Sequence, residues 1–279
     1  MIHIVIPVFN RWHFTQACLQ SLQQQSYTNF KIVVVDHGST DGTFENIKKD
    51  FPEVIVLKGD ESMWWTAATN LGVRFALDNK ADFVLTLNND TIAKENYLEE
   101  LMKVFHNVSQ NTLIGSTALD AISKKVIFAG ENENWFFETS KLNHLDKIKM
   151  NDLFVNCTRF PGRGLLIPVK VYNEIGIYDE KNFPHYLGDY EFTQRARKND
   201  FKIVCSTKAH IFIYPEESGA NHLIKNKTIK AYYNHLFGIR GGAQLKLFYK
   251  YAFRYCPWYA LPSFIFIGTT RRILGYWFK

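Results

Sequence analysis

Short apolar runs alternate with helical patterns through the first hundred residues, and this alternation limits the folds open to the chain. Each run is rich in β-branched residues and is apolar throughout rather than at every second position, as expected of strands buried on both faces. Strands separated by helices of this length form βαβ units with a mainly parallel sheet. We therefore predict an α/β fold with strands at residues 2–8, 31–35, 54–57 and 83–87, and with helices at 15–24, 43–50 and 67–79.

Polar residues cluster where three of these strands end. The clusters are residues 7–10 after the first strand, 36–42 after the second and 88–90 after the fourth. The carboxyl ends of parallel strands meet at one edge of the sheet, and ligands of such folds bind there. The three clusters are therefore predicted to form one binding rim.

The second cluster combines an acid at the strand end with Gly, Ser, Thr and Asp before a helix. Asp36 can accept hydrogen bonds from a base or a ribose, while the N–H groups of the turn and the helix start favour a phosphate. The alternative is a plain strand-to-helix turn in which Asp41 or Thr43 is the N-cap. Neither a GxGxxG nor a GxxxxGK[ST] pattern occurs here, so the usual sequence support for a dinucleotide site or a P-loop is absent.

Asp90 ends an Asn-Asn-Asp sequence directly after the apolar fourth strand. A carboxylate at the rim can hold a hard divalent cation, which would neutralise the clustered charge of a pyrophosphate. A plain polar loop is the alternative interpretation.

Charge is distributed unevenly along the chain. The last acidic residue is Glu217, and the 62 residues after it carry six Lys and four Arg, whereas the first 217 residues have 23 basic and 27 acidic side chains. The two parts need separate explanations. The four cysteines lie far apart without a CxxC pair, which argues against a zinc module or a disulfide framework and suits a reducing cytosol. The N-terminus lacks the features of a signal peptide and is expected to be a buried strand.

Residues 223–279 combine basic and aromatic side chains, and we expect them to form a helical extension after a domain of residues 1–222. The apolar stretch 255–270 is short and holds two prolines, so it does not predict a membrane span. Amphipathic helices on an anionic membrane surface fit this composition best. Nucleic-acid binding is the rival interpretation. The apolar stretch suits a lipid–water interface better than contact with a phosphate backbone, so no nucleic-acid partner is predicted. Core packing or a homodimer contact is a third interpretation.

Five motifs resemble, in order and at similar spacing, the signatures of glycosyltransferase family 2. They are IVIPVFN (4–10), DHGSTDG (36–42), NND (88–90), GRGLLI (162–167) leading to EIGIYD (174–179), and GDYEF (188–192). The resemblance covers roughly residues 2–222. It implies a GT-A fold with a Rossmann-like, mainly parallel sheet flanked by helices, a nucleoside diphosphate sugar as donor, a Mn²⁺ or Mg²⁺ ion, and inversion of the transferred sugar.

The resemblance also implies roles at the rim. Asp36 matches the acid that reads the nucleobase, and Asp90 matches the last acid of a DxD-like motif that binds the metal. Here that motif begins with two Asn, so only one carboxylate is available. The expected donor-binding residues are Pro7, Phe9, Asn10, Asp36, Ser39, Asp41, Trp65, Asn70, Asn88 and Asn89.

Residues 59–72 occupy the family's donor-binding loop and resemble the subset with adjacent tryptophans, which includes rhamnosyltransferase-like members. Trp64 or Trp65 is expected to stack on the base or on a sugar face, with core packing as the alternative. Asn70 is expected to contact the donor or to order this loop. By this resemblance alone, the tryptophan pair implies dTDP-rhamnose as the favoured donor, with a UDP-hexose next.

The family's general base lies in a Glu-Asp-x-Asp run, which here begins Gly188-Asp189. Asp189 is therefore the expected base for the proton of an acceptor hydroxyl. Capping of the following helix is the alternative. His222 is expected as a further metal ligand, because Tyr214 stands where many relatives place a histidine.

The predicted function is transfer of a sugar to a hydroxyl of a glycan or a lipid-linked saccharide at the cytoplasmic face of a membrane. A sugar nucleotidyltransferase is one alternative. An inactive sugar-nucleotide-binding module is another, supported by the missing acid before Asp189. Trp135, Phe136 and His185 are expected to line the acceptor side or simply to pack.

Overall fold

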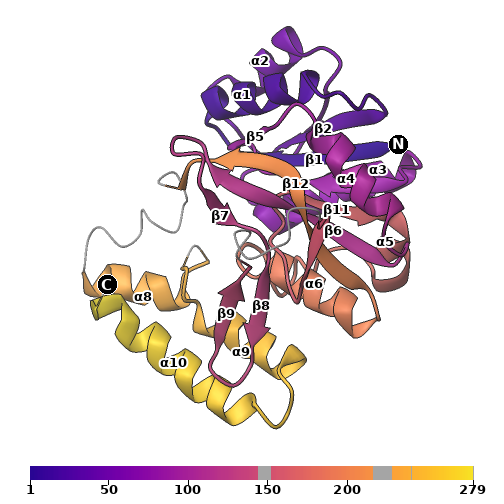
Figure 1. Ribbon diagram of the computed structural model, residues 1–279. Coiled ribbons are helices and arrows are strands. Elements are labelled where there is room, and N and C mark those ends of the chain that lie inside the picture. Colours follow the sequence, from indigo (N-terminus) through magenta and orange to yellow (C-terminus); the bar gives the residue numbers. More distant parts are fainter. Residues whose placement is uncertain (144–151, 216–227, 240, 279) are drawn as a thin grey trace.

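The computed structural model describes residues 1–143, 152–215, 228–239 and 241–278 of the 279-residue chain. Its centre is one mixed sheet with helices on both faces (Figure 1). The main path of this sheet has the strand order β10-β12-β6-β11-β4-β1-β2-β3, while β5 pairs with β12 and β7 pairs with β6.

The N-terminal half of the sheet contains the expected βαβ units. β1 (Ile2–Val8) lies between β2 (Phe30–Asp36) and β4 (Phe83–Thr86), β3 (Ile55–Lys58) follows at the edge, and all these pairs are parallel. The connecting helices are α1 (Trp12–Gln23), α2 (Thr43–Asp50) and α3 (Trp65–Asp78). The predicted α/β class is confirmed, and the boundaries differ from the predicted ones by at most three residues, at the start of α1.

The second half of the sheet is mixed because β11 (Leu165–Pro168) runs antiparallel between β4 and β6 (Thr112–Asp120). Leu165 at the start of β11 pairs with Thr86 at the end of β4. The loop before β11 therefore lies at the edge where the parallel strands end. The other elements are β5 (Thr91–Ala93), β7 (Val126–Phe128), β10 (Phe154–Cys157), β12 (Lys202–Ile213), α4 (Tyr97–His106), α5 (Val169–Ile175) and α6 (Gly188–Lys198).

Helices cover both faces of the sheet. Ile4 of β1 belongs to the core shared with α1, α2 and α4, whereas its neighbour Val5 belongs to the core shared with α3, α5 and α6. β1 is buried along its whole length, as its continuous apolar run predicts. Gly72 lets α3 approach this strand closely, because a Cβ there would lie 2.4 Å from Val5 Cγ1.

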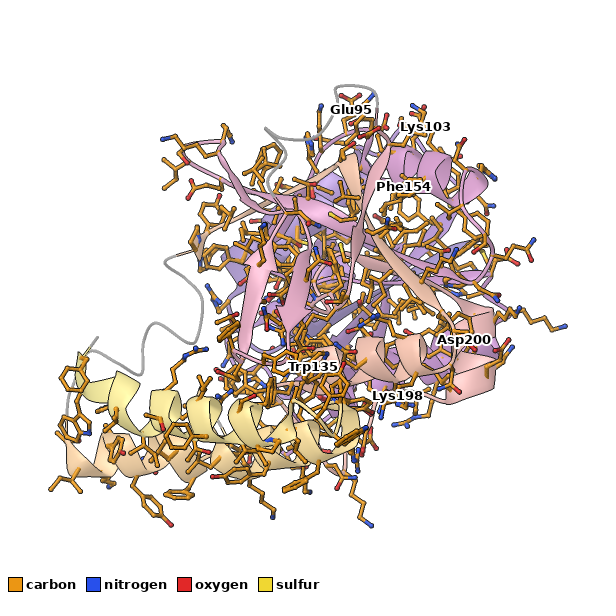
Figure 2. All side chains as sticks on the ribbon, turned by 60° about the horizontal axis from the view of Figure 1, so that its bottom comes forward. Glu95, Lys103, Trp135, Phe154, Lys198 and Asp200 are labelled. Carbon is orange, nitrogen blue, oxygen red and sulfur yellow. The ribbon has the colours of Figure 1, made fainter. Side chains whose placement is uncertain are left out.

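A hairpin of β8 (Glu131–Asn134) and β9 (Thr139–Leu142) extends from the sheet towards three C-terminal helices, α8 (Ile229–Phe237), α9 (Leu245–Tyr255) and α10 (Leu261–Phe278) (Figure 1). Trp135 lies where the hairpin meets these helices (Figure 2). Its ring centroid is 5.9 Å from that of Tyr251 in α9 and 5.2 Å from that of Phe264 in α10. Trp135 therefore packs between the β8–β9 hairpin and the C-terminal helices, which we call the tail.

The helical C-terminal extension is confirmed for the residues that the structure describes. The predicted domain boundary at 222/223 lies outside them. Within the described ranges, none of the helices combines the length and the apolar character that a membrane crossing requires.

Candidate active site

The three polar clusters meet at one edge of the sheet, where a cavity of about 500 Å³ opens. We call it the Asp90 cavity. Side chains from the ends of β1, β2 and β4 line it together with the loop before α3 and the loop before α6. The lining residues are Pro7, Phe9, Arg11, His37, Glu61, Met63, Trp64, Trp65, Asn88, Asn89, Asp90, His185 and Tyr186.

Asp36 ends β2 and directly precedes His37, which lines this cavity; Asp36 itself is not a lining residue and is only 3% exposed. Its Oδ1 accepts hydrogen bonds from the N–H groups of Gly38 (3.2 Å) and Ser39 (2.8 Å). Its Oδ2 is buried and has no hydrogen-bond partner among the described residues. Leaving a buried acceptor unsatisfied costs free energy, so this oxygen is suited to accept an N–H from a ligand.

Phe9 and His37 form a flat wall of the Asp90 cavity. Their rings are stacked, with centroids 5.4 Å apart and planes inclined by 24°. Burial lowers the pKa of His37, against the opposing effect of Asp36, so the imidazole is neutral near pH 7. A neutral aromatic pair offers a stacking surface to a planar ligand. Sequence reasoning did not single out His37, although it directly follows Asp36.

Three of the predicted donor-binding residues shape the turn instead of lining the cavity. The N–H of Asn10 donates to Ser39 Oγ at 2.7 Å, and Asn10 Oδ1 accepts from the N–H of Thr40 at 2.8 Å. Asp41 Oδ1 accepts from the N–H of Thr43 at 3.1 Å, at the start of α2. Asp41 Oδ2 also accepts from the N–H of Trp12 at 3.0 Å. The bonds of Asn10 and Asp41 to residues of the other loop join the loops after β1 and β2, so Asn10, Ser39 and Asp41 hold the rim in place.

Asp90 presents a carboxylate with one uncommitted oxygen. Its Oδ1 is buried without a hydrogen-bond partner in the described part of the chain, and its Oδ2 lies 3.8 Å from the guanidinium of Arg11. A carboxylate oxygen that no protein donor satisfies is a suitable ligand for a hard cation. In residues 1–143, 152–215, 228–239 and 241–278, three or more His, Cys, Asp or Glu side chains nowhere gather into a metal-binding group. His222 lies outside the described residues.

Trp65 separates the Asp90 cavity from a second cavity. Its Nε1 donates to Asn88 Oδ1 at 3.2 Å. Its ring packs onto Gly162, where an added Cβ would lie 2.3 Å from the ring, so only glycine fits here. Trp65, Asn88, His185 and Tyr186 line both cavities and form what we call the shared wall.

The second cavity, of about 520 Å³, contains Asp189 and is called the Asp189 cavity. Asp189 lies in the first turn of α6. Its Oδ2 accepts from the N–H of Gly162 at 3.0 Å and its Oδ1 from the N–H of Tyr190 at 2.8 Å. Burial raises the pKa of Asp189, and these two hydrogen bonds act in the opposite direction. A carboxylate with a raised pKa is a stronger base than an ordinary Asp.

Arg163 also lines the Asp189 cavity and is a residue that sequence reasoning left without a role. Burial lowers its pKa, while the charges of Asp90, Tyr190 and Asp189 act in the opposite direction, so the guanidinium lies in the field of both carboxylates. The antiparallel placement of β11 brings it there. The signal in the sequence was its position between two glycines of the GRG motif.

Asn70 is placed away from both cavities. It is fully buried in α3, its Nδ2 donates to the carbonyl of Tyr178 at 2.9 Å, and its Oδ1 accepts from the N–H of Tyr178 at 3.0 Å. Both ends of the amide are therefore used to hold the segment before α6. Of the two outcomes expected for Asn70, the position favours the ordering of local structure over contact with a donor.

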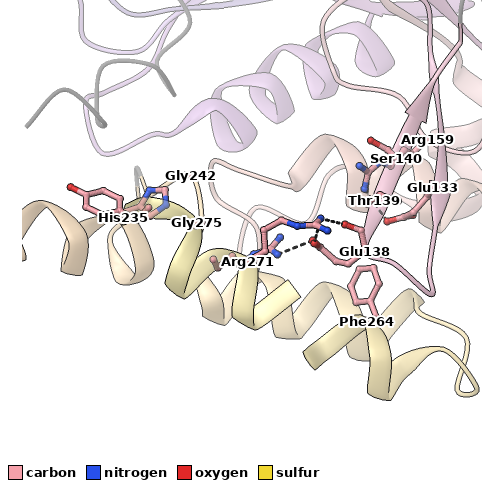
Figure 3. Close-up of a pocket in the computed structure, with 13 residues that line it drawn as sticks. Glu133, Glu138, Thr139, Ser140, Arg159, His235, Gly242, Phe264, Arg271 and Gly275 are labelled. Atoms are coloured by element: carbon pink, nitrogen blue, oxygen red, sulfur yellow. Dashed lines mark hydrogen bonds and ion pairs between the residues drawn. The ribbon is translucent and has the colours of Figure 1, made fainter. Parts of the chain in front are cut away.

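A third cavity, of about 500 Å³, lies between the β8–β9 hairpin and α10 (Figure 3). Glu138 on the hairpin pairs with Arg271 at 2.7 Å and with Arg272 at 2.8 Å. Burial raises the pKa of Glu133 to about 7, although the nearby Arg159 opposes this. None of the predicted site residues lines this hairpin cavity, but it adjoins the Asp189 cavity through Gly242 and Arg272.

Residues 3–175 match the family described as glycosyl transferase family 2. The chain belongs to this family. The matched residues include every lining residue of the Asp90 cavity from Pro7 to Asp90, and they end before His185, Tyr186 and α6, which carries Asp189. The resemblance inferred from the motifs is thereby confirmed.

Relatives of this family 2 member are named as glycosyltransferases. Glycosyltransferase GlyG of Streptococcus pneumoniae is 22% identical over 229 residues, which are 79% of this chain and 72% of GlyG. An uncharacterized glycosyltransferase of Rickettsia felis is 27% identical over 181 residues, which are 64% of this chain. The chain spans only 29% of that Rickettsia protein.

Solved structures of similar fold include GalNAc-T7 with UDP, GalNAc and Mn²⁺, with a TM-score of 0.63 at 14% identity, covering 91% of this chain and 50% of that one. The structure of Staphylococcus aureus TarS 1–349 with UDP has a TM-score of 0.55 at 18% identity, covering 84% and 68%. At such identities the likeness concerns the fold, and the predicted GT-A fold is confirmed.

Proposed function

We propose that this family 2 member transfers a sugar from a nucleoside diphosphate sugar to a hydroxyl of a glycan or a lipid-linked saccharide, with inversion. The observation that carries the proposal is the pair of adjoining cavities with a shared wall, one holding Asp90 and the other Asp189. Inversion requires the leaving diphosphate and the attacking hydroxyl on opposite sides of the anomeric carbon. Two cavities on either side of Trp65 suit that arrangement.

The Asp90 cavity is the proposed donor side. The free oxygen of Asp36 would accept a nucleobase N–H, and the Phe9–His37 wall would stack on the base. Asp90 would hold a Mn²⁺ or Mg²⁺ ion, whose charge offsets that of the departing diphosphate. GalNAc-T7 with UDP and Mn²⁺ supports this choice of ligands. dTDP-rhamnose is the favoured donor and a UDP-hexose the next.

The Asp189 cavity is the proposed acceptor side. As the acceptor oxygen bonds to the anomeric carbon, its proton passes to the carboxylate of Asp189. The bond between that carbon and the diphosphate oxygen breaks, and its electron pair leaves with the nucleoside diphosphate. Arg163 lines this cavity and would add positive charge in the field of both carboxylates.

The proposed function is tested by the product that is released. The protein is first screened for stabilisation by UDP, dTDP, GDP and CDP with Mn²⁺, and is then incubated with the matching nucleotide sugars and saccharide acceptors. Release of nucleoside diphosphate together with a lengthened saccharide is expected. Release of pyrophosphate from a nucleoside triphosphate and a sugar phosphate would identify a nucleotidyltransferase, and binding without turnover an inactive module.

Asp36→Asn is expected to weaken binding of the nucleoside diphosphate by about 10–100-fold, since a hydrogen bond to a charged group contributes about 1.5–3 kcal/mol. Asn keeps one oxygen for Gly38 and Ser39 but places an NH₂ group where Oδ2 would meet the base. Calorimetric titration measures the change, with Asp50→Asn at the exposed end of α2 as the matched control. If the affinity of Asp36→Asn is unchanged, Asp36 does not bind the nucleobase.

Activity is expected to fall on the acid side at a higher pH than an ordinary Asp would cause. The pKa of Asp189 is raised by burial, so the carboxylate becomes protonated, and loses its capacity as a base, before a typical Asp does as the pH falls. A profile of kcat against pH measures this limb, with calorimetry of nucleoside diphosphate binding at the same pH values to separate catalysis from binding. An acid limb at or below the pKa of free Asp would contradict the prediction.

The acceptor side lies next to the C-terminal helices, because Leu247 and Phe248 of α9 and Arg272 of α10 line the Asp189 cavity. This neighbourhood supports a peripheral position at the cytoplasmic face of a membrane, where a lipid-linked acceptor would be presented. A homodimer through the same helices is the competing use of this region.

A further inference from the structure

Exposed apolar side chains gather on the C-terminal helices. Of the eighteen large hydrophobic side chains that are exposed in the described part of the chain, twelve lie between Ile229 and Phe278. Exposed apolar clusters of this density on a folded protein mark interaction surfaces. The twelve are Ile229, Tyr233, Phe237, Ile239, Phe253, Trp258, Tyr259, Phe266, Ile273, Leu274, Trp277 and Phe278.

α10 is apolar on two opposite sides. Its inner side is buried and includes Phe264 and Gly268. Its outer side carries Phe266 (73% exposed), Ile273 (36%) and Trp277 (45%), which are spaced by seven and four residues and therefore form one stripe. Trp277 also contacts α8, but this outer side remains partly exposed, so α10 still has apolar surface to bury.

α8 repeats the pattern beside α10. Ile229, Tyr233 and Phe237 follow one another at intervals of four residues, so they lie on one helix face, and all three are exposed. Tyr232, on another face of α8, packs against Trp277 and Tyr276 of α10 with tilted rings whose centroids are 5.2 Å away. The two helices thus pack on each other and each keeps an exposed aromatic face.

The charges of this region separate into inward and outward groups. Arg254 pairs with Asp179 at 2.7 Å, and Arg271 pairs with Glu138, so these arginines fasten the helices to the rest of the protein. Lys230 and Lys246 are exposed and have no ion-pair partner among the described residues. Since no acidic residue follows Glu217, the outward charge of the tail is positive.

We propose that the outward face of α8 and α10, with Trp258 and Tyr259 at its end, lies on an anionic lipid bilayer surface. Aromatic side chains enter the interface while the lysines remain at the level of the headgroups. The choice of a lipid-linked acceptor rests on the proposed function, whereas the docking surface itself does not. A second copy of the chain is a poorer occupant, because a two-fold contact would place this positive face against itself. Nucleic acid is poorer too, since the paired arginines face inward and the exposed stripe is apolar.

The test is flotation of the full-length protein with phosphatidylcholine vesicles, with and without phosphatidylglycerol. Binding only to the anionic vesicles, with weakening at high salt, is expected. The double variant Phe266→Ser/Trp277→Ser should lower the bound fraction at least tenfold. Lys230→Glu/Lys246→Glu should abolish the preference for anionic vesicles. Ile122→Ser removes an apolar side chain that is even more exposed (83%) and lies outside the C-terminal helices, and this variant should bind like the parent.

Three results would overturn the proposal. The first is that the parent protein does not bind anionic vesicles, and the second is that Phe266→Ser/Trp277→Ser binds as well as the Ile122→Ser control. The third is that light scattering shows the parent protein to be a dimer and Phe266→Ser/Trp277→Ser a monomer. A fourth result, retention of RNA or DNA that Lys230→Glu/Lys246→Glu releases, would also overturn the proposal and assign the face to nucleic acid. Hydrolysis of the nucleotide sugar, followed in solution for each variant, shows whether the donor site is intact. Loss of membrane binding is thereby distinguished from failure of the proposed reaction.

Discussion

Asp189→Asn is expected to lower kcat by about 10²–10⁴-fold and to leave the affinity for the donor nucleotide unchanged. The amide cannot take the proton of the acceptor hydroxyl, whereas the Asp90 cavity, where the nucleotide is proposed to bind, does not include residue 189. The measurement pairs a turnover assay of nucleoside diphosphate release with calorimetric titration of the nucleoside diphosphate.

The control for this variant addresses the two hydrogen bonds that Asp189 accepts. Asn offers one oxygen in place of two, so the N–H of Gly162 or of Tyr190 loses its partner. Asp200→Asn makes the same chemical change at an exposed position outside the cavities, and both variants are compared by thermal melting. Full turnover by a correctly folded Asp189→Asn protein would exclude the base role. Loss of donor affinity together with turnover would assign the carboxylate to holding the loop at Gly162.

Asp90→Asn is expected to reduce activity about a thousandfold and to abolish the response to Mn²⁺ or Mg²⁺. Two unit charges about 4 Å apart interact by roughly 4 kcal/mol at an effective dielectric constant of 20, and the variant removes the carboxylate half of such a pair. The neutral amide is a poor ligand for a hard cation when it must replace the single carboxylate of the motif. Activity is titrated with each metal after treatment with a chelator.

The metal dependence separates this variant from a general loss of structure. Binding of the nucleoside diphosphate should depend on metal in the parent protein and in Asp200→Asn, and should be weak and independent of metal in Asp90→Asn. A variant that retains metal-stimulated turnover would show that Asp90 does not hold the cation. Full activity of the parent protein in the presence of the chelator would contradict the proposed requirement for a metal ion.

The half of the fold that the sequence predicts well is the half built from local signals. Each apolar run between residues 2 and 87 is a strand by composition. These four strands form one parallel block in the order β4-β1-β2-β3, because βαβ units bring nearby strands together in the same direction. β11 breaks this rule, since it enters the sheet between β4 and β6 in the opposite direction. No periodicity in residues 165–168 encodes that pairing.

The candidate site divides in the same way. The ends of β1, β2 and β4 could be placed on one edge because strand direction alone determines it. Arg163 could not be placed from the sequence, because its position depends on the antiparallel orientation of β11 in the sheet. The polar character of Asn10 and Asp41 predicts a place in the site, but the hydrogen bonds of Asn10 join the loops after β1 and β2, and Asp41 accepts from Thr43 at the start of α2. Trp135 packs and His185 lines both cavities, a distinction that composition does not encode.

The shared wall has a thermodynamic consequence. Trp65 is tied to Asn88 by a hydrogen bond and rests on Gly162, whose N–H is bound by Asp189. A molecule that shifts the indole from one side therefore alters the energy of occupancy on the other. Thermodynamic linkage makes this effect reciprocal: if the first ligand changes the affinity for the second by some factor, the second ligand changes the affinity for the first by the same factor. If donor and acceptor bind as proposed, the two cavities form one coupled binding equilibrium.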